Sequence, residues 1–158
     1  MMNETGYYFD SPKEKACGLI IRNICRSIAE EAEKSGNVPE DYASTLCFAC
    51  VDKLGDRVMT FTLGDSHVYS VNSGIASLDE GTRSYDGGGV CATVTEFAQK
   101  HAVMNVRPME KGEGFILATD GAWREWFTDG EMKVNIASME SSLENETLSD
   151  DSTFLYFS

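Results

Sequence analysis

Three aspartates in this sequence stand beside a glycine or serine, next to apolar runs of strand length. They lie in Gly64-Asp65-Ser66, Thr119-Asp120-Gly121 and Ser149-Asp150-Asp151. Asp65 and Asp120 each follow a predicted strand, whereas Asp150 precedes one. If the last strand runs antiparallel to the other two, the three carboxylates meet at one sheet edge, where Mg²⁺ or Mn²⁺ finds oxygen ligands. For any single pair, however, Asp-Gly or Gly-Asp is also ordinary turn chemistry.

Other residues that could take part in chemistry have simpler structural interpretations. Cys47 and Cys50 fall within one apolar run of strand length, so their side chains should point to opposite faces. We therefore predict core thiols rather than a redox or zinc site. His67 is predicted to be a surface residue on a strand. The run Asp86-Gly87-Gly88-Gly89 could bind phosphate through its backbone N–H groups, but a flexible connection is favoured.

The elements that must position these residues begin with a long helix, predicted over residues 12–35. Ser11 is expected to be its N-cap, Pro12 its first residue, and Ser35-Gly36-Asn37 its end. The pattern then changes to β-branched and aromatic residues, which indicates an antiparallel meander. Its strands are expected at residues 44–52, 57–63, 67–72 and, for a short fourth strand, near 75–78.

The second half of the chain is predicted to alternate loops, helices and strands. The expected elements are a loop at 79–90, a helix within 94–103, a strand at 115–119, a helix near 129–140, an acidic linker over 140–149 and a strand at 152–157. Trp123 and Trp126 are expected to pack the helix that follows them onto the sheet. No internal repeat or domain boundary is visible, so we predict a single domain over residues 1–158.

Length and charge narrow the classes of function. The chain has 158 residues and a formal net charge of -13, from 26 acidic and 13 basic residues. Nucleic-acid binding is disfavoured because contacts to phosphates need clustered lysine and arginine. No apolar run approaches the roughly 18 residues that span a bilayer. The N-terminus lacks the features of a signal peptide, so a cytoplasmic protein without a membrane partner is expected.

The order of motifs is more specific than any one of them. The motifs are Ala43-Ser44-Thr45-Leu46, Leu63-Gly64-Asp65-Ser66-His67-Val68-Tyr69, the run from Phe115 to Trp123 that contains Ala118-Thr119-Asp120-Gly121, and Asp150-Asp151-Ser152-Thr153. In order and spacing they resemble the PPM-type (type 2C) metal-dependent protein phosphatases, especially compact bacterial members. The resemblance implies an α+β fold: an antiparallel β-sandwich flanked by helices, shortened here at the N-terminus.

The resemblance also implies an activity. Two Mn²⁺ or Mg²⁺ ions would activate a water for attack on the phosphorus of a phosphoserine or phosphothreonine in a protein. Asp120 and Asp150 match ligands of this two-metal centre, and Asp65 matches a ligand of a third, weaker metal site. Asp151 and Gly121 stand next to these positions, where they would support the ligands.

Departures from the family pattern lead to an alternative function. An Asp-Gly strand that supplies a bridging ligand should precede the helix at residue 12, but Tyr7-Tyr8-Phe9-Asp10-Ser11 stands there. Asp10 could replace that ligand, although a helix-capping role is simpler. The alternative is a catalytically defective relative, or a truncated gene product, that acts as a binding domain. Missing edge strands would also leave backbone groups unpaired, which predicts self-association or marginal stability.

Overall fold

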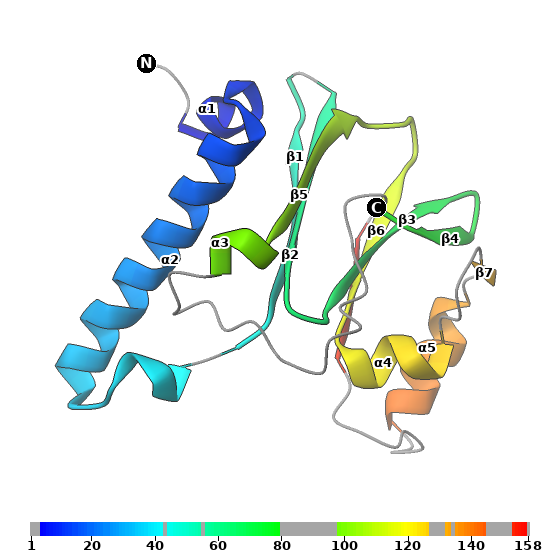
Figure 1. Ribbon diagram of the computed structural model, residues 1–158. Coiled ribbons are helices and arrows are strands. Elements are labelled where there is room, and N and C mark those ends of the chain that lie inside the picture. Colours follow the sequence, from blue (N-terminus) through cyan, green and yellow to red (C-terminus); the bar gives the residue numbers. More distant parts are fainter. Residues whose placement is uncertain are drawn as a thin grey trace.

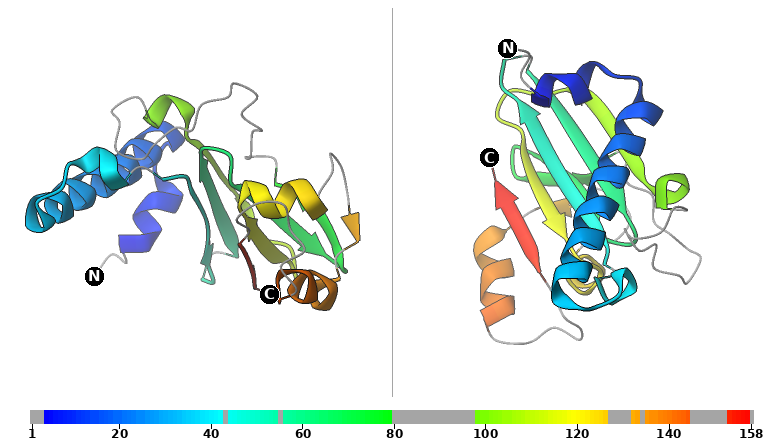
Figure 2. Two further views of the ribbon diagram at one scale, coloured as in Figure 1. Left: turned by 90° about the horizontal axis from the view of Figure 1, so that it is seen from below. Right: turned by 90° about the vertical axis from the view of Figure 1, so that its left-hand side faces the viewer.

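The protein forms a layered sandwich of two antiparallel sheets between two groups of helices, as a computed structural model shows (Figure 1). The residues that the structure describes are 4–42, 44–54, 56–79, 98–126, 132–133, 135–144 and 153–157. Figure 2 shows the N-terminal helices on one outer side and the C-terminal helices on the other. The predicted fold class is therefore confirmed.

One long helix, α2 (Lys13–Ser35), dominates the first layer and confirms the predicted helix over residues 12–35. Gly36 ends the helix with a left-handed backbone (φ 70°), and the N–H of Asn37 caps the Ala32 carbonyl at 2.9 Å. Helix α2 is followed by η1 (Pro39–Tyr42), and α3 (Ala98–His101) lies in the same layer.

The start of α2 differs from the prediction. A separate short helix, α1 (Glu4–Asp10), precedes it, and Pro12 rather than Ser11 is the N-cap residue, without a side-chain hydrogen bond. Phe9 of α1 is buried in the core beneath α2. This burial explains why the segment folds as a helix that packs on the first sheet.

The first sheet has the strand order β1-β2-β5. Its strands are β1 (Leu46–Asp52), β2 (Arg57–Leu63) and β5 (Val103–Pro108). The first two match the predicted strands, whereas β5 was not predicted. The helix expected within 94–103 is described only as α3, and from Val103 onward the chain is a strand that pairs with β2.

The second sheet has the strand order β7-β4-β3-β6-β8. Its strands are β3 (His67–Asn72), β4 (Ile75–Leu78), β6 (Gly114–Ala118), β7 (Met132–Lys133) and β8 (Phe154–Phe157). The predicted strands at 67–72, 75–78, 115–119 and 152–157 are thus present.

The predicted meander is wrong at one connection, because β2 and β3 belong to different sheets. Gly64 has φ +94°, a conformation that favours glycine, and a Cβ there would stand 2.5 Å from Cγ2 of Thr45. The neighbouring Ser66 hydroxyl lies 2.9 Å from the Thr45 hydroxyl. These contacts fold the chain sharply from one sheet to the other.

Three apolar clusters fill the spaces between the layers. The first joins the helices to the first sheet, with Phe61 among its buried members. The second lies between the second sheet and the C-terminal helices, and the third lies between the two sheets, around Phe115. Cys50 packs against the first cluster and Cys47 against the third. The two side chains therefore point to opposite faces of the strand, as predicted. Neither thiol is fully buried, because β1 is an edge strand.

The C-terminal helices are α4 (Asp120–Trp126) and α5 (Ile136–Glu144). The helix expected near 129–140 therefore lies further along the chain, since Met132 and Lys133 form β7 and α5 enters the stretch predicted as an acidic linker. Trp123 and Trp126 pack against the second cluster together with Met139 of α5, as expected.

None of the helices in the described stretches is both long and apolar enough to cross a membrane.

A buried ionic network joins the two sheets at one end of the sandwich. Arg107 of β5 binds Asp79, which follows β4, at 2.9 Å, and also binds Glu113, which precedes β6. Each carboxylate side chain is only 1% exposed. Thr60 and Asn105 of the first sheet donate further hydrogen bonds to Asp79. The network thus fixes the sheets against each other with polar contacts.

Candidate functional site

Strand pairing brings two of the predicted aspartates to one edge of the second sheet. β3 and β6 are antiparallel, with His67 opposite Ala118, so the start of β3 lies beside the end of β6. Asp65 precedes His67 by two residues, and Asp120 follows Ala118 by two residues. The two aspartates therefore lie at the same end of neighbouring strands, as the sequence predicted.

The last strand also begins at this edge. β8 is antiparallel to β6, with Ala118 opposite Phe154, and Thr119 donates its backbone N–H to the Thr153 carbonyl at 3.1 Å. The antiparallel direction on which the three-aspartate prediction depended is therefore confirmed. Asp150 and Asp151 themselves lie outside the described residues, so their place at the edge stays a prediction.

Asp120 is held at the start of α4 by contacts within its own helix. One carboxylate oxygen, Oδ1, accepts the Gly121 N–H at 2.9 Å, and the other, Oδ2, accepts Nη1 of Arg124 at 2.8 Å. The Asp120 side chain is 29% exposed. One oxygen of this carboxylate thus has a cationic partner already, supplied by the chain itself.

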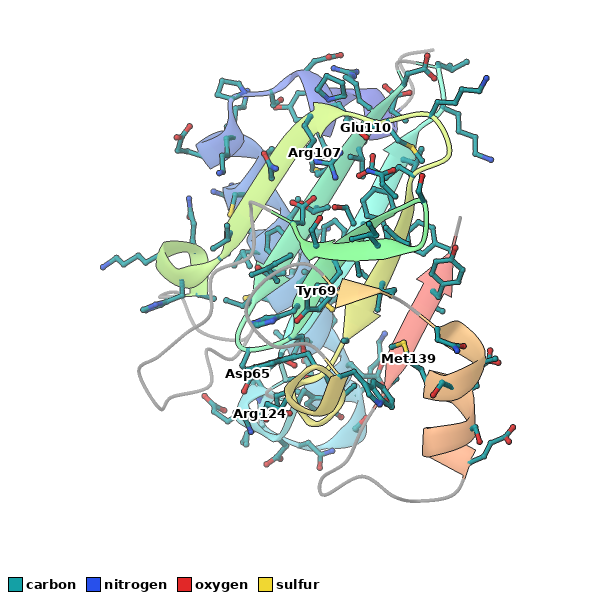
Figure 3. The ribbon with its side chains drawn as sticks, turned by 90° about the vertical axis from the view of Figure 1, so that its right-hand side faces the viewer. Asp65, Tyr69, Arg107, Glu110, Arg124 and Met139 are labelled. Carbon is teal, nitrogen blue, oxygen red and sulfur yellow. The ribbon has the colours of Figure 1, made fainter. Side chains whose placement is uncertain are left out.

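Asp65 is positioned through its backbone. The indole Nε1 of Trp123 donates to the Asp65 carbonyl at 2.8 Å, which ties α4 to the connection between β2 and β3. Figure 3 shows Asp65 and Arg124 at the same end of the molecule, with Arg107 at the opposite end. The side chain of Asp65 is half-buried.

His67 is buried beneath α4, and the predicted surface position was wrong. Its side chain is 4% exposed and stacks on Trp123, with ring centroids 4.3 Å apart and an angle of 11° between the planes. Its Nδ1 lies 3.2 Å from the Tyr69 hydroxyl. β3 is a central strand, so a helix that packs on the sheet covers this position. The local sequence held no signal of this burial, because Trp123 is far from His67 along the chain.

Asp10 lies at the other end of the sandwich and cannot take part in this site. It binds Arg57 at 2.7 Å, and Arg57 also binds Asp52 at 2.9 Å. Arg57 begins β2, whereas Asp65 follows the end of that strand. Seven residues of strand separate the two ends by about 20 Å. The helix-capping role is not observed either, since Asp10 is the last residue of α1.

The described residues at this edge offer the right type of ligand for a hard divalent cation, but too few of them. Asp65 and Asp120 supply carboxylate oxygens, the ligands that Mg²⁺ and Mn²⁺ prefer. Within the described stretches, however, no group of three or more metal-ligating side chains lies close together. A two-metal centre needs more ligands than these two aspartates supply.

The cysteines offer no alternative nucleophile among the residues whose structure is described. Burial raises the pKa of the Cys47 thiol to about 11, and it also raises the pKa values of Cys17, Cys25 and Cys50. Thiols with raised pKa values remain protonated near neutral pH and are poor nucleophiles. This agrees with the predicted role of these cysteines as packing residues.

A polar cavity of about 470 Å³ lies beside the buried ionic network, away from the aspartate edge. Its lining side chains contact one another: the hydroxyls of Ser70 and Ser77 are 3.2 Å apart, and Asn72 donates to Glu110 at 3.0 Å. These contacts and the neighbouring Arg107 network belong to the joint between the two sheets.

Comparison with protein families gives one match over most of the chain. The family described as Protein phosphatase 2C matches residues 7–153. Among curated proteins, no sequence matches. The matched residues include Asp65, Asp120 and every described strand except β8.

Several solved structures align with the chain at low sequence identity. PppA of Pseudomonas aeruginosa, described as a key regulatory component of T6SS, is 17% identical, with a TM-score of 0.45 over 70% of this chain. The Mn-presoaked phosphatase domain of SpoIIE from Bacillus subtilis is 14% identical, with a TM-score of 0.49 over 99% of this chain and 72% of its own length. The chain spans only 48% of the length of PppA.

Proposed function

Because this chain belongs to the protein phosphatase 2C family, we propose that it is a metal-dependent phosphatase domain acting on phosphoserine or phosphothreonine in proteins. The observation that carries the proposal is the placement of Asp65 and Asp120 at one edge of the second sheet. Carboxylate oxygens from separate elements that lie at one sheet edge are the kind of ligand that Mg²⁺ and Mn²⁺ prefer. The family's dependence on Mn²⁺ or Mg²⁺ would explain that arrangement.

The residues proposed to hold the metals are Asp65, Asp120 and Asp150. The metals would neutralise charge on the phosphoryl oxygens and lower the pKa of a bound water. Asp120 is rigidly placed by the hydrogen bond from Gly121, and Asp65 by the bond from Trp123 to its carbonyl. Asp151 would support Asp150 from the neighbouring position.

Hydrolysis of p-nitrophenyl phosphate and of a phosphothreonine peptide at millimolar Mn²⁺ tests this proposal. We expect turnover that EDTA abolishes, and a loss of about 100-fold or more in Asp120→Asn, equivalent to about 2.7 kcal/mol. Asp56→Asn is the matched control, because Asp56 is an exposed turn residue before β2, at the far end of that strand. Full activity in Asp120→Asn would contradict the proposal.

A second function is favoured by the contacts of Asp120 and Asp10. Arg124 already occupies one oxygen of Asp120, and Asp10 pairs with Arg57 at the other end of the sheet. We therefore also consider a relative that binds phosphorylated proteins in the cytoplasm without hydrolysing them. This candidate predicts a folded protein that binds a phosphothreonine peptide in calorimetry and shows no turnover with Mn²⁺ or Mg²⁺.

A further inference from the structure

On one side of the sandwich, the described part of the first sheet ends before the second sheet does. On the opposite side the two sheets meet, because Arg107 of β5 binds Asp79 after β4. Across the sandwich, β2 contacts β3, and β1 contacts β3 and β6. This leaves β8 as an outermost strand that lies beyond β1, and Figure 2 shows β8 (red) on the outer side of β6 (yellow). Among the described strands, the first sheet is therefore one strand short on this side.

The exposure of Leu155 shows that the inner face of β8 is open. Leu155 lies opposite Leu117 of β6, and Phe157 lies opposite Phe115, so these four side chains share the face toward the first sheet. Phe115 is fully buried in the cluster between the sheets, and its ring centroid stands 5.4 Å from that of Phe157. Leu155 is nevertheless 57% exposed. An apolar side chain thus faces the layer between the sheets without a described strand above it.

The outer edge of β1 borders the same space. All residues of β1 are half-buried, and those from Leu46 to Val51 carry no charge. In an edge strand, alternate backbone N–H and C=O groups point away from the sheet. No described strand pairs with these groups of β1. We call the outer edge of β1, together with the adjoining Leu155, the open edge: it offers backbone hydrogen bonds along β1 and an apolar contact above β8.

The charges of the protein favour a basic partner over a second copy of this chain. The formal net charge of -13 makes two copies repel each other at low salt. At the far end of β1, the carboxylates of Asp10 and Asp52 both bind the one guanidinium of Arg57. The Asp10 side chain is 70% exposed. A segment that carries lysine or arginine therefore complements both the whole molecule and this end of the open edge.

We propose that the open edge binds an extended, basic segment of another protein, which pairs with β1 as an additional strand of the first sheet. The side chains of this segment that point toward the second sheet are apolar and cover Leu155. Those that point the other way are lysine or arginine. Backbone hydrogen bonds to β1 supply affinity, and the alternation of side chains supplies specificity. The inference does not depend on the proposed function, because it uses no residue assigned to metal binding.

Fluorescence anisotropy of a labelled peptide tests the proposal at low salt and micromolar protein. The peptide alternates valine and lysine, is blocked at both ends, and has seven residues, as β1 has. Its control is the same sequence with methyl groups on the backbone nitrogens, which keeps the charge and the apolar side chains but prevents strand pairing. We expect saturable binding of the first peptide and at least about ten-fold weaker binding of the second, because several hydrogen bonds are lost. Equal binding of the two peptides, or binding of neither, would overturn the proposal.

Two variants locate the binding site. Leu155→Ser removes the apolar contact above β8, and Val38→Ser is its control, since Val38 is 55% exposed and lies between α2 and η1. We expect Leu155→Ser to bind the unmethylated peptide about three- to ten-fold more weakly than Val38→Ser does. Hydrogen exchange should show that the outward-facing amides of β1 become protected when the peptide binds. Equal affinities of the two variants, or protection only outside β1, would contradict the proposed site.

A second copy of this chain is the competing occupant of the open edge. Sedimentation equilibrium under the same conditions should show a monomer that binds the peptide. Added salt should weaken peptide binding, because it screens the attraction between the lysines and the acidic protein, whereas it should favour association of two copies. A discrete dimer at low salt that the peptide does not dissociate would assign the open edge to a second copy and overturn the proposal.

Discussion

At the scale of single residues, the burial of its partner decides how much each arginine contributes to the stability of the fold. Arg124 and Arg107 both bind aspartate at 2.8 to 2.9 Å, but the partner of Arg107 is 1% exposed and that of Arg124 is 29% exposed. A buried carboxylate cannot turn to water when its partner leaves, whereas an exposed one can. We therefore expect Arg107 to hold the fold together, and the exposed pair between Arg124 and Asp120 to contribute little to stability.

Replacing Arg107 by leucine should destabilise the protein severely. The substitution leaves both Asp79 and Glu113 buried without their cation, and removal of one partner from such a network costs about 3–5 kcal/mol. Urea unfolding followed by circular dichroism measures this loss. Arg26→Leu, on the exposed face of α2, should change the free energy of unfolding by less than about 0.5 kcal/mol. Equal stability of the two variants would contradict the structural role of Arg107.

At the scale of elements, the aspartate edge depends on how α4 is attached. The hydrogen bond from Trp123 to the Asp65 carbonyl is the contact that links this helix to the connection between β2 and β3. The stack on His67 adds an apolar contact to the same attachment. The aspartate edge therefore depends on the pairing of β3 with β6 and also on one aromatic side chain that belongs to neither strand.

Trp123→Phe tests this attachment. Phenylalanine keeps an aromatic ring but cannot donate the hydrogen bond, so we expect a loss of about 1 kcal/mol in unfolding free energy. If Asp65 and Asp120 hold the proposed metal, Mn²⁺ affinity should also fall, because the Asp65 backbone loses its hydrogen bond to α4. Trp126→Phe, in the same helix and cluster, is the comparison. If both variants bind Mn²⁺ with the same affinity, the hydrogen bond from Trp123 does not position the aspartate edge.

Local patterns predicted most elements but not their pairing. The helical spacing of apolar residues predicted α2, and β-branched runs predicted β1 to β4. β5 was missed because Asn105 and Arg107 interrupt its apolar pattern and Pro108 ends it. Those polar side chains contact the buried Asp79, a partner that lies far away in the sequence.

At the scale of the whole molecule, the sandwich has an unusually apolar edge. All six residues from Leu46 to Val51 in β1 are uncharged and half-buried, and they pack alternately on two different clusters. β1 is the edge strand of its sheet, and no described strand pairs with its outer side. Strands that are apolar on both faces usually lie inside a sheet, so this edge lacks the protection that exposed edges carry.

We expect β1 to cause self-association at high protein concentration. Sedimentation velocity should show larger species as concentration rises, and more of them at higher salt, because salt screens the net charge of -13. Ala49→Lys places a charge in the middle of the strand and should shift the protein toward the monomer. Ala137→Lys, on an exposed position of α5, is the control. A protein that is monomeric at every concentration would contradict this prediction.

The sequence by itself determined the order of the motifs, the main helix, most strands and the family that they indicate. It could do so because helix and strand periodicity and turn residues act over a few neighbouring positions. Only the tertiary structure decided that β2 and β3 separate into two sheets, that His67 is buried, that Asp10 lies at the far end and that Arg124 contacts Asp120. Those facts depend on contacts between distant segments, and local patterns do not encode which distant surfaces meet.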